Sequence, residues 1–470
     1  MILKIIAENA GGTEPMFSDT IAAISTPLGE GGLAVVRLSG PASFKVADSC
    51  FKPLGKNSTS AGKAASHTIQ YGKILLNGEV VDEVLLSVFR APRTFTKENM
   101  VEVSCHGGVL PAQMVLDALL RGGARLAEPG EFTRRAFLNG RIDLAQAEAV
   151  ADLIHSRTEL ALRAANEQLA GKLSCRIDAL RSDLMLVLAH VEAHIDFPDE
   201  DIAPDTFDQL LSKLRKASEY IEQLLSTARE GRILRRGLRT AIIGRPNAGK
   251  SSLLNQLLGQ DRAIVSPIAG TTRDTIEETA NVRGIPIVFV DTAGLRESKD
   301  EIEAEGIRRS REAASQAELI LHVVDASQAV HEEDQNLIAE FGSQNSILIW
   351  NKSDLIDRTA DTEPRVQGIP VSCVTGEGIE LLKDQIKNLV WSGNIGSEML
   401  EATINSRHQD ALQRANSSLK LTISALEENQ TLELAAMDLR LAVQAIGEVV
   451  GKTTTEDLLD AIFSQFCLGK

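Results

Sequence analysis

Short apolar runs separated by polar turns fill the N-terminal part of the chain. Between them, Pro41–Cys50 and Leu110–Leu120 have the apolar spacing of helices. The runs themselves are typical of β-strands, at Ile21–Ile24, Leu33–Leu38, Ile74–Leu76, Val84–Val88 and Met100–Val103. We therefore predict an α+β domain over residues 19–130, preceded by a flexible extension over residues 1–18 in which Met16 is a possible natural start.

From Glu131 onward the apolar residues recur every three or four positions, which is typical of helices. One stripe, ended by Pro198, predicts a single long helix that carries Leu169, Leu173, Ile177, Leu180, Leu184, Leu188, Val191 and Ile195. Further helices are expected at Phe207–Leu225, Asp410–Leu426, Leu432–Ile446 and Asp457–Phe466. Because the earlier stripes need a partner, we predict one all-α domain built from residues 131–235 and 395–470; two separate helical modules are the alternative.

Between these two helical parts, strands alternate with helices from Leu238 to Leu389. This alternation predicts a doubly wound α/β sheet with a ligand at the carboxyl ends of its strands. Residues 236–394 would then form a domain inserted into the helical one. The expected fold class is a multidomain α/β plus all-α protein.

Composition and charge narrow the class of protein. With 470 residues, of which 43% are hydrophobic and 24% charged, the chain is long enough for two or three folded domains. No apolar run approaches the roughly 20 residues that span a bilayer, and the five cysteines are widely spaced. We therefore expect a cytoplasmic protein without disulfides, structural zinc or membrane contact. The net charge of −16 means that an RNA partner would need a local basic patch or a second protein.

A phosphate-binding loop, Gly244-x-x-x-x-Gly249-Lys250-Ser251, lies between a short strand and a helix. Its glycines let backbone N–H groups point at phosphate oxygens, and the helix N-terminus adds positive potential. Lys250 would reach the β- and γ-phosphates, and the Ser251 hydroxyl would bind Mg²⁺. The residues expected to contact the nucleotide here are Gly244, Asn247, Ala248, Gly249, Lys250, Ser251 and Ser252.

Later segments predict that the base is guanine. Asn351-Lys352-Ser353-Asp354 follows another strand, and the Asp354 carboxylate can accept both N–H groups on guanine's Watson–Crick edge. Adenine does not offer this pair of donors; a coincidental Asn-Lys-x-Asp turn is the alternative. The remaining nucleotide contacts are expected from two further segments. Asp291, Thr292, Ala293 and Gly294 form the metal-side motif, which puts a carboxylate near the metal and a glycine N–H near the γ-phosphate. Ser372, Cys373 and Val374 form the loop that closes over the base.

Two polar stretches are candidate switches. The first spans residues 264–274 and offers the Thr272 hydroxyl to Mg²⁺, whereas the second runs from Gly294 to Glu303. Leu295 stands where many small GTPases have the glutamine that orients the attacking water, so hydrolysis needs another side chain. The nearby candidates are Glu297, Asp300, Glu301 and Glu303, which alternatively only keep the loop hydrated.

The negative charge that develops on the phosphates during hydrolysis also needs a positively charged partner. The side-chain carbonyl of Asn247, with backbone oxygens of the first switch, would hold a monovalent cation against the phosphates. The alternatives are that Asn247 only braces the loop, and that Arg273 or Arg296 supplies the positive charge.

Over residues 18–470 the chain resembles the bacterial tRNA-modification GTPases of the MnmE (TrmE) family. Within the nucleotide domain the resemblance lies in residues 244–255 (GRPNAGKSSLLN), 268–274 (IAGTTRD) and 291–296 (DTAGLR). Elsewhere it lies in residues 129–132 (PGEF), 143–149 (DLAQAEA), 195–200 (IDFPDE) and 466–470 (FCLGK). It implies an N-terminal folate-binding domain that dimerises, an all-α domain and an inserted Ras-like GTPase domain.

The resemblance also implies what the protein does. Family members act as homodimers with a flavoprotein partner, MnmG (GidA), which carries FAD. Together they modify carbon 5 of wobble uridines in tRNA by joining a one-carbon unit from 5-formyl- or methylene-tetrahydrofolate to an amine or glycine, which gives an aminomethyl or carboxymethylaminomethyl group. GTP, Mg²⁺ and K⁺ are the expected cofactors of this chain.

Roles for single residues follow from the same resemblance. The K⁺ ligand would be Asn247, completed by Ser266, Ile268 and Thr271, and the glutamate that activates water would be Glu303. Folate contacts would come from Arg37, Glu102, Arg141 and Lys470.

Two departures from the family and one shared cysteine bear on these roles. Arg141 replaces the family's lysine, and Cys373-Val374 replaces Ala-Lys or Ala-Arg, which should weaken packing on guanine. Cys467 corresponds to a cysteine implicated in the modification chemistry; an inert thiol is the alternative.

A regulatory or ribosome-assembly GTPase without modification chemistry is the alternative function. Such proteins usually append a basic RNA-binding domain, whereas this chain is acidic and ends in Cys467-Leu-Gly-Lys470. A helical scaffold with a degenerate nucleotide site is disfavoured by the four intact motifs.

Overall fold

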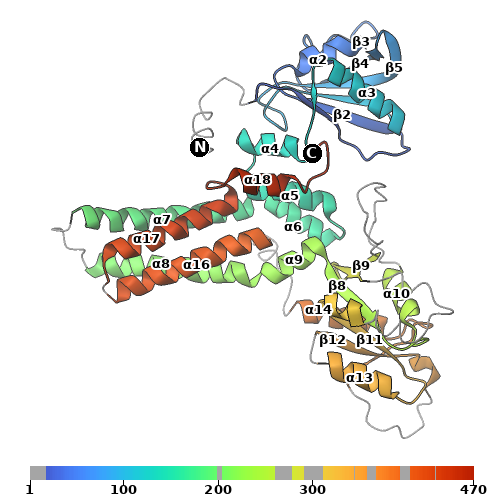
Figure 1. Cartoon of the computed structure of the whole chain (residues 1–470), viewed down its shortest axis with the longest axis vertical. Coiled ribbons are helices and arrows are strands. Elements are labelled where there is room, and N and C mark those ends of the chain that lie inside the picture. The colour runs from blue at the N-terminus through green and yellow to red at the C-terminus, as the bar shows by residue number, and fades with distance from the viewer. Residues whose placement is uncertain are drawn as a thin grey trace.

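The computed structural model has three domains: an N-terminal sheet domain, a rod of helices, and a second sheet domain at one end of the rod (Figure 1). It describes residues 17–197, 204–259, 278–290, 311–342, 345–356, 367–391, 403–428 and 430–470. The predicted fold class is confirmed, and residues 1–16 of the expected flexible extension lie outside the described residues. No helix in these described ranges is both long enough and apolar enough to cross a membrane.

The N-terminal domain is a seven-stranded sheet, in the order β3-β4-β5-β6-β2-β1-β7, with helices α2 (Ser43–Cys50) and α3 (Val109–Arg121). Its strands are β1 Ile21–Ile24, β2 Leu33–Ser39, β3 Phe51–Pro53, β4 Thr68–Leu76, β5 Glu79–Phe89, β6 Met100–His106 and β7 Arg125–Leu126. All five expected strands are present. The apolar pattern misses β3 and β7, which have only three and two residues and are too short to show alternation.

Alternation along β2 and β6 places the first candidate site residues. Val36, Leu38, Val101 and Val103 are buried in one core with α2 and α3. The residues between them, Arg37 and Glu102, are paired in register and point to the opposite face, because successive side chains of a strand alternate.

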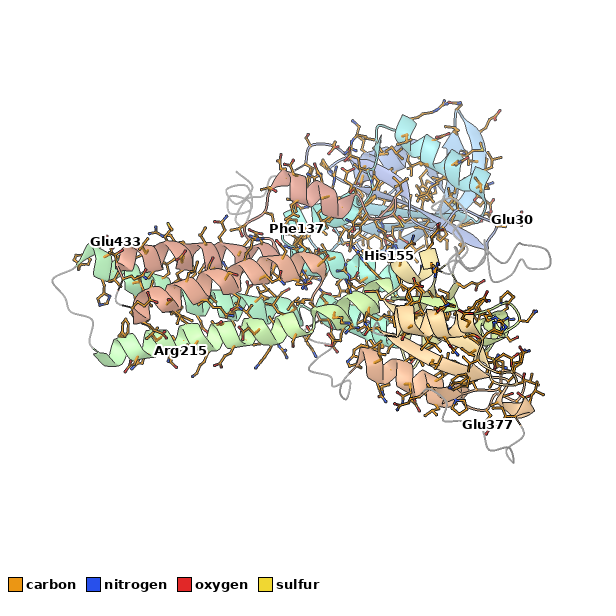
Figure 2. The ribbon with its side chains drawn as sticks, turned by 60° about the horizontal axis from the view of Figure 1, so that its bottom comes forward. Glu30, Phe137, His155, Arg215, Glu377 and Glu433 are labelled. Atoms are coloured by element: carbon orange, nitrogen blue, oxygen red, sulfur yellow. The ribbon has the colours of Figure 1, made fainter. Side chains whose placement is uncertain are left out.

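The rod is a bundle whose four long helices share one apolar core (Figure 1). Figure 2 shows Arg215 and Glu433 along this rod, far from Glu377 on the second sheet domain. The helices of the all-α part are α4 Glu131–Leu138, α5 Leu144–His155, α6 Glu159–Leu169, α7 Lys172–Asp196, α8 Pro204–Ser226, α9 Ala228–Arg236, α16 Ser406–Glu427, α17 Leu432–Val450 and α18 Glu456–Phe463. Since α7, α8, α16 and α17 bury their stripes together, the helices before and after the insertion form a single bundle.

One detail of the predicted stripe is wrong. Leu169 ends α6 and does not belong to the long helix, which begins at Lys172. Gly171 lies between them with φ +82, a left-handed conformation that glycine adopts without strain and that interrupts helical geometry.

The inserted domain is a six-stranded sheet in the order β13-β12-β11-β8-β10-β9, parallel except for β9. Helices α10 (Lys250–Leu258) and α14 (Ile379–Val390) share one core with α9, and α13 (Glu332–Phe341) belongs to a second core. The strands are β8 Leu238–Ile243, β9 Glu278–Val282, β10 Ile285–Phe289, β11 Leu319–Asp325, β12 Ser346–Asn351 and β13 Ile369–Pro370. Helices therefore cover both faces, as the alternating pattern predicts.

Helix α5 binds the chain near both points where it passes between the bundle and the inserted domain. Glu148 is 7% exposed; its carboxylate accepts from Asn405 Nδ2 at 2.9 Å and from Arg407 Nη2 at 2.8 Å, at the returning crossing. One turn later, Asp152 accepts from Arg235 Nε at 2.7 Å, at the outgoing crossing. Burial raises the pKa of Asp152 to about 6 against the pull of Arg235. At Glu148 burial also opposes ionisation, but Arg407 and His408 together outweigh it and hold the pKa well below its ordinary value.

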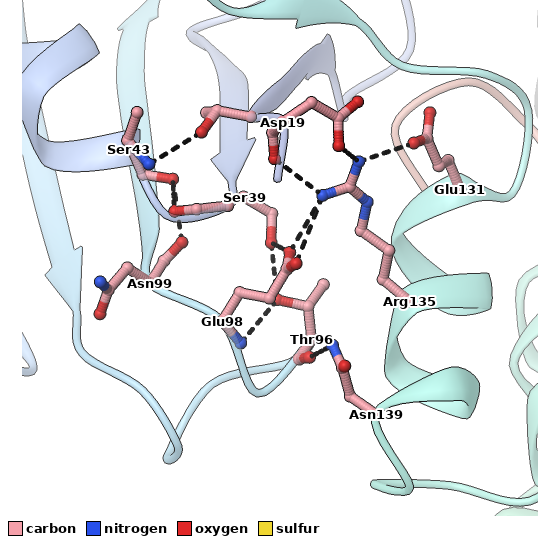
Figure 3. Close-up of polar contacts among 12 residues, drawn as sticks. Asp19, Ser39, Ser43, Thr96, Glu98, Asn99, Glu131, Arg135 and Asn139 are labelled. Carbon is pink, nitrogen blue, oxygen red and sulfur yellow. Dashed lines mark hydrogen bonds and ion pairs between the residues drawn. The ribbon is translucent and has the colours of Figure 1, made fainter. Parts of the chain in front are cut away.

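Arg135 of α4 joins the helical part to the N-terminal sheet (Figure 3). Its side chain is 1% exposed, and its guanidinium donates to Asp19 Oδ1 at 2.8 Å, Glu131 Oε1 at 2.9 Å and Glu98 Oε1 at 3.3 Å. It also lies 4.4 Å from the ring centroid of Phe17. Burial raises the pKa of Glu98, so the ionised form of this carboxyl depends on Arg135.

We predict that Arg135→Gln lowers the local stability around α4 and β1 by about 3–5 kcal/mol, because it leaves the buried carboxyl of Glu98 without its cation, whereas Asp19 and Glu131 keep Arg125. Hydrogen exchange of peptides that cover residues 17–24 and 131–138 measures this directly. Arg134→Gln is the matched control. Arg134 pairs with Asp460, which is 62% exposed, and its loss should cost at most about 1 kcal/mol. Equal loss of protection in the two variants would contradict the role given to Arg135.

Candidate functional site

The phosphate-loop residues follow β8 at its carboxyl end. At Gly244 (φ +143) an added Cβ would come within 2.1 Å of the Val323 carbonyl oxygen. At Gly249 (φ +97) it would come within 2.0 Å of Asn351 Nδ2. Both positions therefore accept only glycine, and Gly249 sits directly before α10, whose N-terminal N–H groups favour an anion.

Asn351 ties the phosphate loop to the base-binding loops. Asn351 is only 2% exposed. Its Nδ2 donates to the Ala248 carbonyl at 2.8 Å, and its Oδ1 accepts from the Cys373 N–H at 3.3 Å. Three loops from different strands are thus held at one edge of the sheet by a single amide.

Lys250 lies over the phosphate loop. Its Nζ donates to the carbonyl oxygens of Gly244 at 2.8 Å and Arg245 at 3.0 Å. Burial lowers the pKa of Lys250, so a phosphate would gain a poorly hydrated cation as its partner. Ser251, Ser252 and Asn247 are exposed at the same loop, and Asn247 is held at φ +62.

Asp325 is a site residue that the motifs do not identify. It ends β11 in register with Asn351, and its Oδ2 accepts from Lys352 Nζ at 2.6 Å. Partial burial disfavours the ionised carboxylate, but Lys352 and Ser327 outweigh it and lower the pKa of Asp325. The ion pair fixes Lys352, whose φ is +62, two residues before Asp354, which is expected to bind guanine. The mostly apolar run of residues 319–324, which this aspartate directly follows, is the sequence signal that would have found it.

The base-closing residues lie around the same edge. Asp354 is exposed in the short 3₁₀ turn η1 (Ser353–Leu355). Ser372 is fully buried, and Val374 is 85% exposed. Burial, with a smaller contribution from Asp354, raises the pKa of Cys373 to about 11, so its thiol is neutral.

Both switches, residues 264–274 and 294–303, lie entirely outside the described residues. This applies to the expected site residues Ser266, Ile268, Thr271, Thr272, Asp291, Thr292, Ala293, Gly294 and Glu303. Their contacts stay predictions.

A second cluster brings the C-terminal tail onto the N-terminal sheet. Arg37 Nε donates to Glu102 Oε1 at 2.8 Å, and Arg37 Nη1 donates to the Gly469 carbonyl at 3.3 Å. The Ser25 hydroxyl donates to the same carbonyl at 3.1 Å, and the Phe132 N–H donates to the Lys470 carbonyl at 3.2 Å. The tail can lie this close because residue 469 is glycine: with φ +84, an added Cβ would come within 2.4 Å of the Ile24 carbonyl.

Aromatic rings connect the cationic residues of this cluster. The guanidinium carbons of Arg37 and Arg141 lie 5.8 Å and 5.2 Å from the centroid of the Phe95 ring. The guanidinium carbon of Arg37 also lies 5.7 Å from the centroid of the Phe132 ring. Burial, reinforced by Arg37, lowers the pKa of Lys470. Three cations, one carboxylate and flat rings suit an anionic ligand that has a planar ring. The rings carry no motif, so the sequence does not single them out.

Cys467 is close to this cluster. Its residue is partly buried, and its carbonyl accepts from the N–H groups of Gly130 and Lys470, both at 3.4 Å. The structure therefore brings Arg37, Glu102, Lys470 and Cys467 together, with Arg141 linked through Phe95.

Comparisons with known proteins identify the family of the chain. Two family models match the chain: "GTP-binding protein TrmE N-terminus" over residues 20–141 and "MnmE helical domain" over residues 144–467. The "tRNA modification GTPase MnmE" of Bacillus subtilis (strain 168) is 48% identical over 463 residues, which cover 96% of this chain and 100% of that protein. The protein of the same name from Lactococcus lactis subsp. lactis (strain IL1403) is 47% identical over 453 residues, 96% of this chain and 98% of its own.

The chain belongs to the MnmE family of tRNA modification GTPases. The expected resemblance is thereby confirmed, and so is the class of enzyme, a GTPase.

For this MnmE-family chain we predict that Asp354→Asn lowers GTP affinity by roughly 100-fold, because an amide cannot accept both guanine N–H groups. Xanthine has a carbonyl where guanine has its amino group, so the variant should bind xanthosine triphosphate better than GTP. Titration with fluorescent nucleotides checks both. Asp384→Asn, on the surface of α14 where Asp384 pairs with Arg283, should change neither affinity. Unchanged GTP binding by Asp354→Asn would refute guanine recognition by this carboxylate.

Proposed function

We propose that this chain is a potassium-dependent GTP hydrolase that acts, with a flavoprotein of the MnmG (GidA) kind, in the modification of carbon 5 of wobble uridine in tRNA. The observation that carries the proposal is the meeting of Lys250, Asn351 and Asp354 at one sheet edge, in a chain 47–48% identical to MnmE proteins. A cytoplasmic homodimer is the proposed working form.

The phosphate end of the site would work through charge and positioning. Lys250 and the N–H groups before α10 would hold the β- and γ-phosphates. Mg²⁺, when bound, neutralises phosphate charge, and the hydroxyls of Ser251 and Thr272 would hold it. Glu303 would orient the attacking water and accept its proton.

Asn247 would hold K⁺ together with backbone oxygens of Ser266, Ile268 and Thr271. Support comes from its place on the exposed rim of the phosphate loop, with its side chain in no hydrogen bond to the described part of the chain. An unengaged amide oxygen at this position suits a hard monovalent cation. We infer that two GTPase domains approach face to face, which would close this cation site.

The second cluster would serve the modification chemistry. Arg37, Arg141 and Lys470 would bind the carboxylates of a tetrahydrofolate, with its ring near Phe95. 5-formyl- or methylene-tetrahydrofolate would supply the one-carbon unit, and Cys467 would lie beside it as a candidate nucleophile. FAD would reside on the partner flavoprotein.

We predict that wild-type chain hydrolyses GTP at least about tenfold faster in KCl than in NaCl at equal ionic strength, and that Asn247→Ala hydrolyses at the slow rate in both. The loss follows because the variant lacks the side-chain ligand for K⁺. Steady-state release of phosphate measures the rates, and nucleotide titration provides the control that GTP still binds. Equal wild-type rates in the two salts would remove the role of Asn247.

We predict that Glu303→Ala binds GTP normally but hydrolyses it at least about 100-fold more slowly, the magnitude expected for loss of a general base. In a strain that lacks this chain, nucleoside analysis of tRNA should show unmodified wobble uridine, restored by wild type and not by Glu303→Ala. Near-wild-type turnover would eliminate Glu303 as the base. Normal modification in the strain without the chain would refute the tRNA-modification function.

A further inference from the structure

A cluster of arginines lies where the bundle meets the GTPase domain (Figure 1, α9 and β8). Residues 228–239 contain five arginines and one acid, Glu230, although the chain as a whole has a net charge of −16. Arg229, Arg232 and Arg236 are spaced by three and four residues, so they share one face of α9, and all three are exposed.

The arginine face continues from α9 onto the sheet. Arg232 Nη2 donates to Glu318 Oε1 at 2.5 Å, and the Glu318 N–H donates to the Arg239 carbonyl at 2.7 Å. Arg232 and the exposed Arg239, the second residue of β8, are therefore neighbours. The phosphate loop follows the other end of β8, so this basic surface and the nucleotide lie at opposite edges of the sheet.

Most of this positive charge is not neutralised. Arg235 turns inward to Asp152, and Arg232 shares Glu318. In contrast, the side chains of Arg229, Arg236 and Arg239 have no acidic partner in the part of the chain that the structure describes. Exposed guanidinium groups without counter-charges create a local positive potential even in an acidic protein.

We propose that the surface formed by Arg229, Arg232, Arg236 and Arg239 binds the phosphate backbone of tRNA. The proposal rests on the proposed function, which makes tRNA the substrate, and adds the place of contact. Guanidinium groups bind phosphate oxygens through two parallel hydrogen bonds. Arg229 to Arg236 spans about 10 Å of helix, which allows contacts to successive phosphates. Such contacts position an RNA without reading its sequence.

The test uses the full-length chain and an unmodified tRNA transcript. Binding of labelled tRNA is followed by fluorescence anisotropy from 50 to 300 mM KCl for wild type and for R229Q/R236Q/R239Q. We expect the triple variant to lose at least about tenfold in affinity at 50 mM. Its plot of log K against log salt should be shallower by about 2, because each lost phosphate contact contributes roughly 0.7–0.9 to the slope.

The matched control removes the same charge elsewhere. Lys45, Lys56 and Lys63 are exposed on the N-terminal domain, and K45Q/K56Q/K63Q should keep both the affinity within about twofold and the salt slope. Hydrolysis of GTP without tRNA should be unchanged in both triple variants.

Three outcomes would overturn the proposal: equal loss in the two triple variants, unchanged binding by R229Q/R236Q/R239Q, or no tRNA binding by wild type at 50 mM. If this variant lost binding of the flavoprotein partner but kept tRNA, the surface would be a protein-docking site instead. Each result is separate from the proposed function, because potassium-dependent hydrolysis and the nucleoside analysis of tRNA are read without this variant.

Discussion

The apolar stripes of α7 and α8 are covered only when α16 and α17 return to them, and the whole architecture depends on this burial. Leu173, Ile177 and Leu214 are fully buried in a core that Leu419 and Ile446 complete. These two groups of helices are separated in the chain by the GTPase domain. Burial of apolar surface is the main favourable term in folding, so the bundle forces both ends of the inserted domain to one place.

That constraint brings the two crossings together at α5, where Glu148 and Asp152 bind them one turn apart. A buried carboxylate such as Glu148 is tolerable only while Arg407 and Asn405 stay in contact, and removal of one partner of such a group costs about 3–5 kcal/mol. Helix α5 therefore binds the bundle-side residues of both crossings, Arg235 and Asn405. A movement at either crossing has to be accommodated by α5, which also leads to α4 and Arg135.

The C-terminal tail makes a second contact between distant parts of the chain. The Gly469 carbonyl lies 3.3 Å from Arg37 Nη1, a contact between residues 432 positions apart. It follows from α18, which packs on α4 and so directs the last residues onto the N-terminal sheet. The cluster of Arg37, Glu102, Lys470 and Phe95 thus requires all of the chain that precedes and follows the GTPase domain.

The sequence by itself determined the elements and the chemistry that depend on neighbours in the chain. The spacing of apolar residues predicts five strands of the first sheet and the long helices. Fixed motif spacings predict the phosphate loop and the guanine motif, because a loop of glycines or an Asn-Lys-x-Asp turn forms locally. Tertiary structure decided what joins distant residues: Asn351 with Ala248, Asp325 with Lys352, and the tail with Arg37. No local pattern encodes these contacts, because each depends on how separate elements pack and which buried polar groups then need partners.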